Sequence, residues 1–373
     1  VSVVKNPLEC DDCLATVRAC ESFGAKIERG DGLSITGVAG KPTRSDSDVD
    51  VGESGTTMRF MAAAYALCRG ATTVTGIGSV LSRPIRSLLD SLVDLGATRA
   101  RALGPDGCPP VCIGGRMGGG STTLDGDSSQ YVSALLLACP LADNDSMISV
   151  TELRSAPYVR MTLEHIKRAR AGVWAKNHDF FVPGGQIYRP TEYTVPGDYS
   201  SAAFPMAAAA ITGSDIHIAG LDPDDVQGDR CFSEMMKAIL AGGDCDLDLG
   251  DAPDLLPILA VVGCFGGGAT RLRNAPHARR KESDRISAIC GELAKMGADI
   301  AETADGLVVK PSKLRGMELS GHGDHRIVMA LAVAGLGADG RTIIDGADTI
   351  SKSYPGFADD LADLGASIRK VEG

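Results

Sequence analysis

The chain has 373 residues, 44% hydrophobic and 23% charged, which is a globular composition in a length that favours two domains over one core. Its net charge of −11 argues against a general nucleic-acid or anionic-membrane partner, although a few local cations would suffice for small anions. No apolar run approaches the roughly 20 residues that span a bilayer. The 11 cysteines, without a secretory signal, indicate a reducing cytoplasm.

The start of the chain reads as a strand from its first residue. Residues 1–4 are Val-Ser-Val-Val, and no methionine precedes them. We therefore expect a protein whose first segment is missing or is supplied as a separate piece. A single Cys-x-x-Cys follows at Cys10 and Cys13, but no second pair stands at zinc-ribbon spacing, so it indicates no metal site.

One sequence pattern recurs along the chain: a helical stretch ends in an apolar residue plus glycine, and a strand-like run follows. The pattern is typical of a helix closed by a glycine in the left-handed region. Asp31-Gly32 and Asp305-Gly306 suit hairpin turns between the strands that follow. The six copies of this sequence pattern predict an α/β fold of six helix-plus-strand units, three in each domain. The six glycines are Gly24, Gly96, Gly172, Gly242, Gly297 and Gly365.

A domain boundary is expected near Pro196-Gly197, which gives a first lobe of residues 1–195 and a second of residues 196–373. An alanine-rich helix, 202–211, opens the second lobe, with Ser200 and Ser201 as candidate caps. The dinucleotide fingerprint, the P-loop and the calcium loop are all absent as sequence motifs.

Two turns that contain hydroxyl side chains precede apolar helices. Residues 52–59, Gly-Glu-Ser-Gly-Thr-Thr-Met-Arg, would expose backbone N–H groups to an anion, although a simple capped helix start has the same pattern. Residues 127–130 precede an apolar helix, 131–139, and their hydroxyls would either cap that helix or hold a phosphate.

Three further segments carry charge. The densest cluster spans residues 279–286, where a solvated helix face is the simpler interpretation. Asp324-His325-Arg326 stands before an apolar helix, and buried charge there is costly unless something pairs it. Lys352 is an isolated cation in a serine-flanked loop.

Taken in order, these segments form a series that resembles the EPSP synthase (5-enolpyruvylshikimate-3-phosphate synthase) family over essentially the whole chain. The series also includes Pro253-Asp254, and its most specific motifs are Lys-Glu-Ser-Asp-Arg at 281–285 and Asp-His-Arg at 324–326. The resemblance implies enolpyruvyl transfer from phosphoenolpyruvate to shikimate 3-phosphate, with release of phosphate. It also implies two similar lobes, each built from three βαβαββ units, that close over the substrates.

The resemblance implies a role for each matching residue. Asp254 and Glu282 would be the catalytic carboxylates, with Asp254 as base toward the sugar hydroxyl and Glu282 as proton donor. Because Asp254 stands in a mostly apolar run, we expect burial to raise its pKa. The residues expected to hold phosphoenolpyruvate are Gly55, Arg83, Gln130, Arg285, Arg326 and Lys352. Those expected to hold shikimate 3-phosphate are Ser128, Ser129, Gln130, Ser155, Tyr158, Asp254 and Lys281.

The sequence departs from the family pattern at three places. Glu53 stands where the family usually has Asn, and Phe60 where a smaller residue is usual, so affinity for phosphoenolpyruvate and the response to glyphosate are open. The family's first strand carries Lys-Ser and an Arg that touch both substrates, and nothing before Val1 supplies them. We therefore expect the 373 residues alone to be essentially inactive.

The resemblance implies no metal and no cofactor, and we expect a cytoplasmic monomer. Two alternatives remain at this point. The chain could be an inactive or split enzyme that needs a separate N-terminal segment. The sister transferase acting on UDP-N-acetylglucosamine is disfavoured, because its loop cysteine has no counterpart in residues 76–82.

Overall fold

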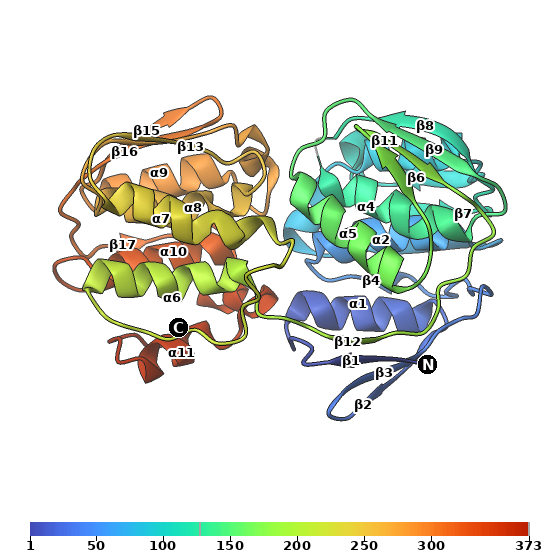
Figure 1. Ribbon diagram of the computed structural model, residues 1–373, viewed down its shortest axis with the longest axis horizontal. Coiled ribbons are helices and arrows are strands. Elements are labelled where there is room, and N and C mark those ends of the chain that lie inside the picture. Colours follow the sequence, from blue (N-terminus) through green and yellow to red (C-terminus); the bar gives the residue numbers. More distant parts are fainter. Residues whose placement is uncertain (127, 372–373) are drawn as a thin grey trace. The chain divides into compact units, whose positions relative to one another are not determined.

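The computed structural model describes residues 1–126 and 128–371. The chain divides into two compact units, Val1–Val195 and Pro196–Gly373 (Figure 1). Each unit combines helices with short strands, which confirms the expected α/β class. Within the described residues, no helix is both long and apolar enough to cross a membrane.

The first unit contains three four-stranded sheets, ordered β12-β1-β3-β2, β4-β5-β7-β6 and β10-β11-β9-β8. Each sheet combines one parallel pair with antiparallel pairs. Its elements are β1 (Ser2–Lys5), α1 (Asp11–Ser22), β2 (Lys26–Arg29), β3 (Gly32–Thr36), β4 (Val49–Asp50), α2 (Gly55–Tyr65), β5 (Ala71–Thr75), α3 (Arg86–Asp94), β6 (Arg99–Ala102), β7 (Val111–Gly114), β8 (Gly120–Leu124), α4 (Ser129–Ala138), β9 (Ser146–Val150), α5 (Ala156–Arg168), β10 (Trp174–Lys176), β11 (Asp179–Val182) and β12 (Glu192–Thr194).

The second unit has one sheet of the same design, ordered β13-β14-β16-β15, and a parallel pair, β17-β18. Its elements are α6 (Tyr199–Thr212), α7 (Phe232–Leu240), β13 (Cys245–Asp248), α8 (Leu256–Cys264), β14 (Thr270–Arg273), α9 (Arg285–Lys295), β15 (Asp299–Thr303), β16 (Gly306–Lys310), β17 (Glu318–Leu319), α10 (His325–Leu336), β18 (Ile343–Ile344) and α11 (Phe357–Asp363).

A βαβαββ unit repeats in this order of elements. It runs from β4 to β7, again from β8 to β11, and a third time from β13 to β16. The sheet that contains β1 obtains its parallel partner from far along the chain, since β12 pairs with β1 in the register Val3 to Glu192. Strand β12 therefore takes the place that the first strand of a repeat occupies in the other sheets.

Five of the six predicted glycine turns adopt the left-handed conformation. Gly24, Gly96, Gly242, Gly297 and Gly365 have φ between +92° and +106°, each two residues after its helix ends. The prediction for Gly172 is wrong. Helix α5 ends at Arg168, so Arg170, with φ +59°, occupies the left-handed position instead. Both predicted hairpins form, as β2–β3 and β15–β16.

The start of α6 also differs from expectation. The helix begins at Tyr199, and the carboxylate of Asp198 accepts hydrogen bonds from the backbone N–H groups of Ser200 and Ser201. The expected serine caps are wrong because both serines lie inside the first turn. Asp198, directly before the helix, reaches two of its unpaired N–H groups at once.

The helices of the repeats carry much of the core. All residues of α8 are buried, and most residues of α2, α4 and α10 are buried as well. A helix that is apolar on every side must be covered on every side, which explains why the sheets lie around these helices (Figure 1). Four predicted site residues stand at the first turns of such helices: Gly55 in α2, Ser129 and Gln130 in α4, and Arg326 in α10.

Candidate active site

The first turns of α2 and α4 lie together in the first unit. Gln130, in the first turn of α4, donates a hydrogen bond from Nε2 to the hydroxyl of Thr56 in α2, at 2.8 Å. The Tyr131 hydroxyl donates to the carbonyl of Pro84 at 2.6 Å, and this bond holds the segment that carries Arg83 against α4. Two predicted residues from separate repeats, Gln130 and Arg83, are thereby positioned beside α2.

Gly55 begins α2 under two guanidinium groups. A Cβ atom added there would lie 2.4 Å from Nη1 of Arg59 and 2.7 Å from Nη1 of Arg83. Arg59 is 4% exposed and donates from Nη1 to the carbonyl of Gly55 at 2.8 Å. A side chain at position 55 would displace both cations, so the close approach requires glycine. We refer to Gly55, Arg59, Arg83 and Gln130 as the first-unit cluster.

The predicted serines stand at the starts of two neighbouring helices. Ser128 is the N-cap residue of α4 and Ser155 that of α5, and neither side chain caps its helix. The Thr162 hydroxyl of α5 donates to the Ser133 hydroxyl of α4 at 2.7 Å, which ties the two helices together. Ser129 lies in the first turn of α4 and Tyr158 in that of α5. An N-terminal turn with exposed N–H groups favours an anion.

The two departures from the family pattern also lie in this region. The Glu53 carboxylate covers Gly78, where an added Cβ atom would be 1.7 Å from Oε1. Phe60, the residue after Arg59 in α2, is partly buried and packs against the core of the first unit.

In the second unit, Arg285 is the centre of an ion-pair network. Its guanidinium, only 2% exposed, donates to Asp254 at 2.7 Å, to Glu282 at 2.6 Å and to Asp324 at 2.7 Å. The three carboxylates come from the 3-10 helix Pro253–Leu255, the loop before α9, and the N-cap of α10. The interpretation of residues 279–286 as a solvated helix face is therefore wrong for Arg285.

Asp254 receives two further cations. Its carboxylate lies 3.3 Å from Nζ of Lys281 and 3.6 Å from Nη2 of Arg326, and its side chain is 15% exposed. Burial pushes the pKa of Asp254 upward, but Lys281, Arg326 and Arg285 act against it, and the pKa lies well below its usual range. The expectation of a raised pKa is wrong, because the sequence could not show that three cations from other segments surround the carboxylate.

Asp324 organises the start of α10 by two different contacts. Its carboxylate caps the helix by accepting from the backbone N–H of Arg326 at 3.0 Å, and it accepts from the Ser283 hydroxyl at 3.0 Å. The Arg326 side chain instead donates to the carbonyl of Asp254 at 3.4 Å. Lys352, 7% exposed, lies nearby and donates to the carbonyl of Gly323 at 3.5 Å.

The structure therefore collects all the predicted residues of the second unit in one place. We refer to Asp254, Lys281, Glu282, Arg285, Asp324, Arg326 and Lys352 as the second-unit cluster. Four cations and three carboxylates share this space, so an arriving anion can exchange with an internal carboxylate as the partner of a cation. Such an exchange would return basicity to the carboxylate that loses its cation.

Comparisons with known proteins show the family of this chain. The family model for EPSP synthase (3-phosphoshikimate 1-carboxyvinyltransferase) matches residues 1–361. The chain belongs to the EPSP synthase family. It is 41% identical to the 3-phosphoshikimate 1-carboxyvinyltransferase of Acetivibrio thermocellus, covering 100% of this chain and 92% of that protein. It is 46% identical to that of Methanothrix thermoacetophila, covering 98% of this chain and 90% of the relative.

A solved structure shows the same fold. The EPSP synthase of Acinetobacter baumannii superposes with a TM-score of 0.81 at 27% identity, covering 100% of this chain and 91% of that one. The resemblance inferred from the motif series is thus confirmed. The UDP-N-acetylglucosamine transferase and the inactive fragment are not favoured by these comparisons.

Two residues that the structure places in these clusters, Arg59 and Asp324, are not among the site residues predicted from the sequence. Arg59 was part of the Gly-rich motif, but its position over Gly55 depends on the helical spacing of four residues, which the sequence does carry. Asp324 belongs to the Asp-His-Arg motif, but the sequence predicts no role for its side chain. Its pairing with Arg285 joins segments 39 residues apart, and nothing in the local sequence indicates such a contact.

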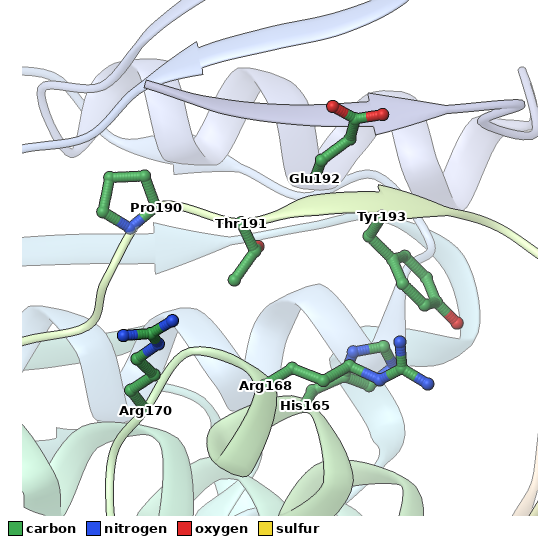
Figure 2. Close-up of a pocket in the computed structure, with 7 residues that line it drawn as sticks. All are labelled: His165, Arg168, Arg170, Pro190, Thr191, Glu192 and Tyr193. Carbon is green, nitrogen blue, oxygen red and sulfur yellow. The ribbon is translucent and has the colours of Figure 1, made fainter.

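A separate hollow of about 310 Å³ lies at the end of α5 in the first unit (Figure 2). In Figure 2 Tyr193 points toward Arg168 and His165, whereas Glu192 points away from them. The Arg168 guanidinium stands 5.2 Å from the centre of the Tyr193 ring, and the His165 ring packs edge-on at 4.8 Å. None of the predicted substrate-binding residues lines this hollow. Its lining residues are His165, Arg168, Arg170, Pro190, Thr191, Glu192 and Tyr193.

Proposed function

We propose that the chain transfers the enolpyruvyl group of phosphoenolpyruvate to shikimate 3-phosphate and releases phosphate, using the residues of both clusters. The observation that carries the assignment of the chemistry is the position of Asp254, 2.7 Å from the buried Arg285 and within 3.6 Å of Lys281 and Arg326. A carboxylate surrounded by cations is ionised and can accept a proton, while the cations can bind two anionic substrates.

Asp254 acts as the base toward the sugar hydroxyl. Its low pKa makes it a weak base while Lys281, Arg326 and Arg285 all face it. When substrate phosphate or carboxylate groups bind Lys281 and Arg326, these cations are shared with the ligands, and the proton affinity of Asp254 rises. Binding of the correct substrates thus prepares the base, and the oxygen of the sugar hydroxyl attacks the enol ether carbon as its proton passes to Asp254.

Glu282 completes the acid–base pair. It delivers a proton to the methylene carbon of phosphoenolpyruvate in the addition step. In the elimination step the Glu282 carboxylate takes a proton back from the methyl group so formed, the C=C bond is restored, and phosphate leaves the tetrahedral intermediate with the proton that Asp254 had accepted. Arg285, which makes four hydrogen bonds to three carboxylates, holds Asp254 and Glu282 in place in addition to its predicted contact with phosphoenolpyruvate. Arg83, Gly55, Gln130 and Lys352 complete the phosphoenolpyruvate contacts.

Hydroxyl groups of the first unit hold shikimate 3-phosphate. The proposal assigns this ligand to the helix starts of α4 and α5, and the family resemblance adds Lys281 and Asp254. Support comes from the position of Ser128 as an N-cap residue whose side chain leaves α4 uncapped. The residues proposed to contact shikimate 3-phosphate are Ser128, Ser129, Gln130, Ser155, Tyr158, Asp254 and Lys281.

We also propose that the enzyme works as a monomer in the cytoplasm. All 11 cysteines are free, which suits a reducing compartment, and each unit has its own hydrophobic core. Light scattering coupled to size-exclusion chromatography would test the oligomeric state. A mass near 38.6 kDa is expected, and twice that mass would contradict the proposal.

The function is tested by phosphate release. We expect release only when shikimate 3-phosphate and phosphoenolpyruvate are both present, because the hydroxyl of one attacks the other. Release with phosphoenolpyruvate alone would mean simple hydrolysis. Release with UDP-N-acetylglucosamine in place of the shikimate would assign the chain to the sister reaction.

A further inference from the structure

Asp229 is a buried acid for which the proposed reaction has no use. It lies in the 3-10 helix Gly228–Cys231 of the second unit and is 2% exposed. Its Oδ2 accepts a hydrogen bond from the Ser200 hydroxyl in the first turn of α6. Its Oδ1 is buried and has no hydrogen-bond partner among residues 1–126 and 128–371. A buried carboxyl oxygen without a partner is costly, so its retention calls for an explanation.

The charged groups that act on Asp229 come from several elements. Burial raises the pKa of Asp229 to about 6, and the charges of Asp254 and Asp198 add to this rise. Arg326 of α10 and the Ser200 hydroxyl act in the opposite direction and lower the pKa. Burial, and after it the charges of Asp229 and of Glu234 in α7, raise the pKa of the Cys231 thiol on the same 3-10 helix. Arg326 is thus the one cation among these groups, and it is also one of the three cations that contact Asp254.

We propose that Asp229 is a positioning residue that sets the charge against which an anion binds at Arg326, and that its carboxyl group takes up a proton from solvent when that anion binds. An anion bound beside Arg326 offsets the positive charge that otherwise stabilises the ionised carboxylate of Asp229. Once the charge of Arg326 is offset, the neutral form of the buried Asp229 carboxyl group is favoured over the ionised form. The inference rests on the proposed assignment of Arg326 to phosphoenolpyruvate.

The reciprocal effect can be measured. Because the anion favours protonated Asp229, protonated Asp229 must favour the anion to the same extent. Affinity for phosphoenolpyruvate should therefore fall as the pH rises through the range in which Asp229 ionises. Asp229→Asn keeps the shape and removes the charge, so the variant should lack this loss.

The experiment measures kcat/KM for phosphoenolpyruvate between pH 5 and 8 on the full chain and its variants. The titration of the substrate itself cancels in the ratio of variant to wild type. We expect the Asp229→Asn ratio to rise by roughly threefold to tenfold from pH 5 to 8, since a coupling of about one pKa unit corresponds to tenfold. A ratio that is the same at every pH would mean a merely structural role and would overturn the proposal.

Two serine variants keep the proposal testable if Asp229→Asn does not fold. Ser200→Ala removes the hydroxyl that stabilises the ionised Asp229 carboxylate. The pH midpoint of the fall in kcat/KM for phosphoenolpyruvate should therefore be higher in this variant than in the wild type. Ser201→Ala is the matched control, because its hydroxyl donates to Asp198 and not to Asp229, and its midpoint should not move. If both variants keep the wild-type midpoint, Asp229 does not control affinity.

Arg326→Ala separates this proposal from the assignment on which it rests. If that variant leaves the KM for phosphoenolpyruvate unchanged, the assignment of Arg326 has failed. If the KM rises while the Asp229→Asn ratio stays flat with pH, the assignment holds and only the role of Asp229 is refuted.

Discussion

Replacing Asp254 by asparagine removes one negative charge and keeps the size of the side chain. We expect kcat to fall by roughly 10²–10⁴, the usual contribution of a positioned acid–base group. Binding of shikimate 3-phosphate should change far less, because removing the carboxylate also removes one internal competitor for Lys281 and Arg326. The effect should therefore appear in kcat rather than in the affinity for the substrates.

The structure also limits the effect of this change on folding. Arg285 loses its 2.7 Å contact with Asp254 but keeps Glu282 at 2.6 Å and Asp324 at 2.7 Å, so its buried charge remains paired. The cost is that of one charge-assisted hydrogen bond, about 1.5–3 kcal/mol, rather than that of an orphaned buried cation. The N-cap residue of α8 is Leu255 and not Asp254.

Steady-state rates measured beside thermal melts separate catalysis from stability. Asp284→Asn is the matched control, because Asp284 is also a paired carboxylate but caps α9 and contacts Arg279 at 2.9 Å. That variant should lose about 0.5–2 kcal/mol of stability and keep its rate. An Asp254→Asn enzyme with wild-type kcat, or an Asp284→Asn enzyme with an equal loss of kcat, would refute the reasoning.

Three further predictions concern binding and stability. Arg326→Ala should raise the KM for phosphoenolpyruvate about tenfold to a hundredfold, the worth of a charge-assisted hydrogen bond; an unchanged KM would restrict Arg326 to its contact with Asp254. Gly55→Ala should raise the KM for phosphoenolpyruvate by displacing the guanidinium groups of Arg59 and Arg83. Its control is Gly291→Ala, in an open helical position of α9, which should gain up to about 1 kcal/mol of stability and leave the KM unchanged. Equal kinetics for the two variants would argue against the close approach of the two guanidinium groups to Gly55. Burial lowers the pKa of His325 to about 4. Between pH 6.5 and 4 the unfolded chain therefore protonates this histidine and the folded chain does not, so the free energy of unfolding is full above pH 6.5 and falls by about 3 kcal/mol by pH 4. Urea unfolding across that range should show this loss in the wild type and not in His325→Gln.

Local signals in the sequence determined the repeating architecture. A glycine placed after an apolar residue closes a helix because it alone adopts positive φ without strain, and five of the six such positions do so. The exception, where Arg170 replaces Gly172, shows that the end of α5 is set by its packing rather than by the nearest glycine. The family could be recognised because its binding residues occur in short motifs whose order survives in the chain.

Tertiary structure alone decided the electrostatics. The apolar neighbours of Asp254 in sequence predict a raised pKa, yet Lys281, Arg285 and Arg326 reach it from 27 to 72 residues away and lower it instead. The same holds for Asp324, which contacts Arg285, and for Asp229, whose charged and hydrogen-bonding neighbours come from three other elements. Hydrophobic burial follows a residue's own neighbours and so can be read along the chain. Coulombic interactions depend on distance in space, which the fold alone determines.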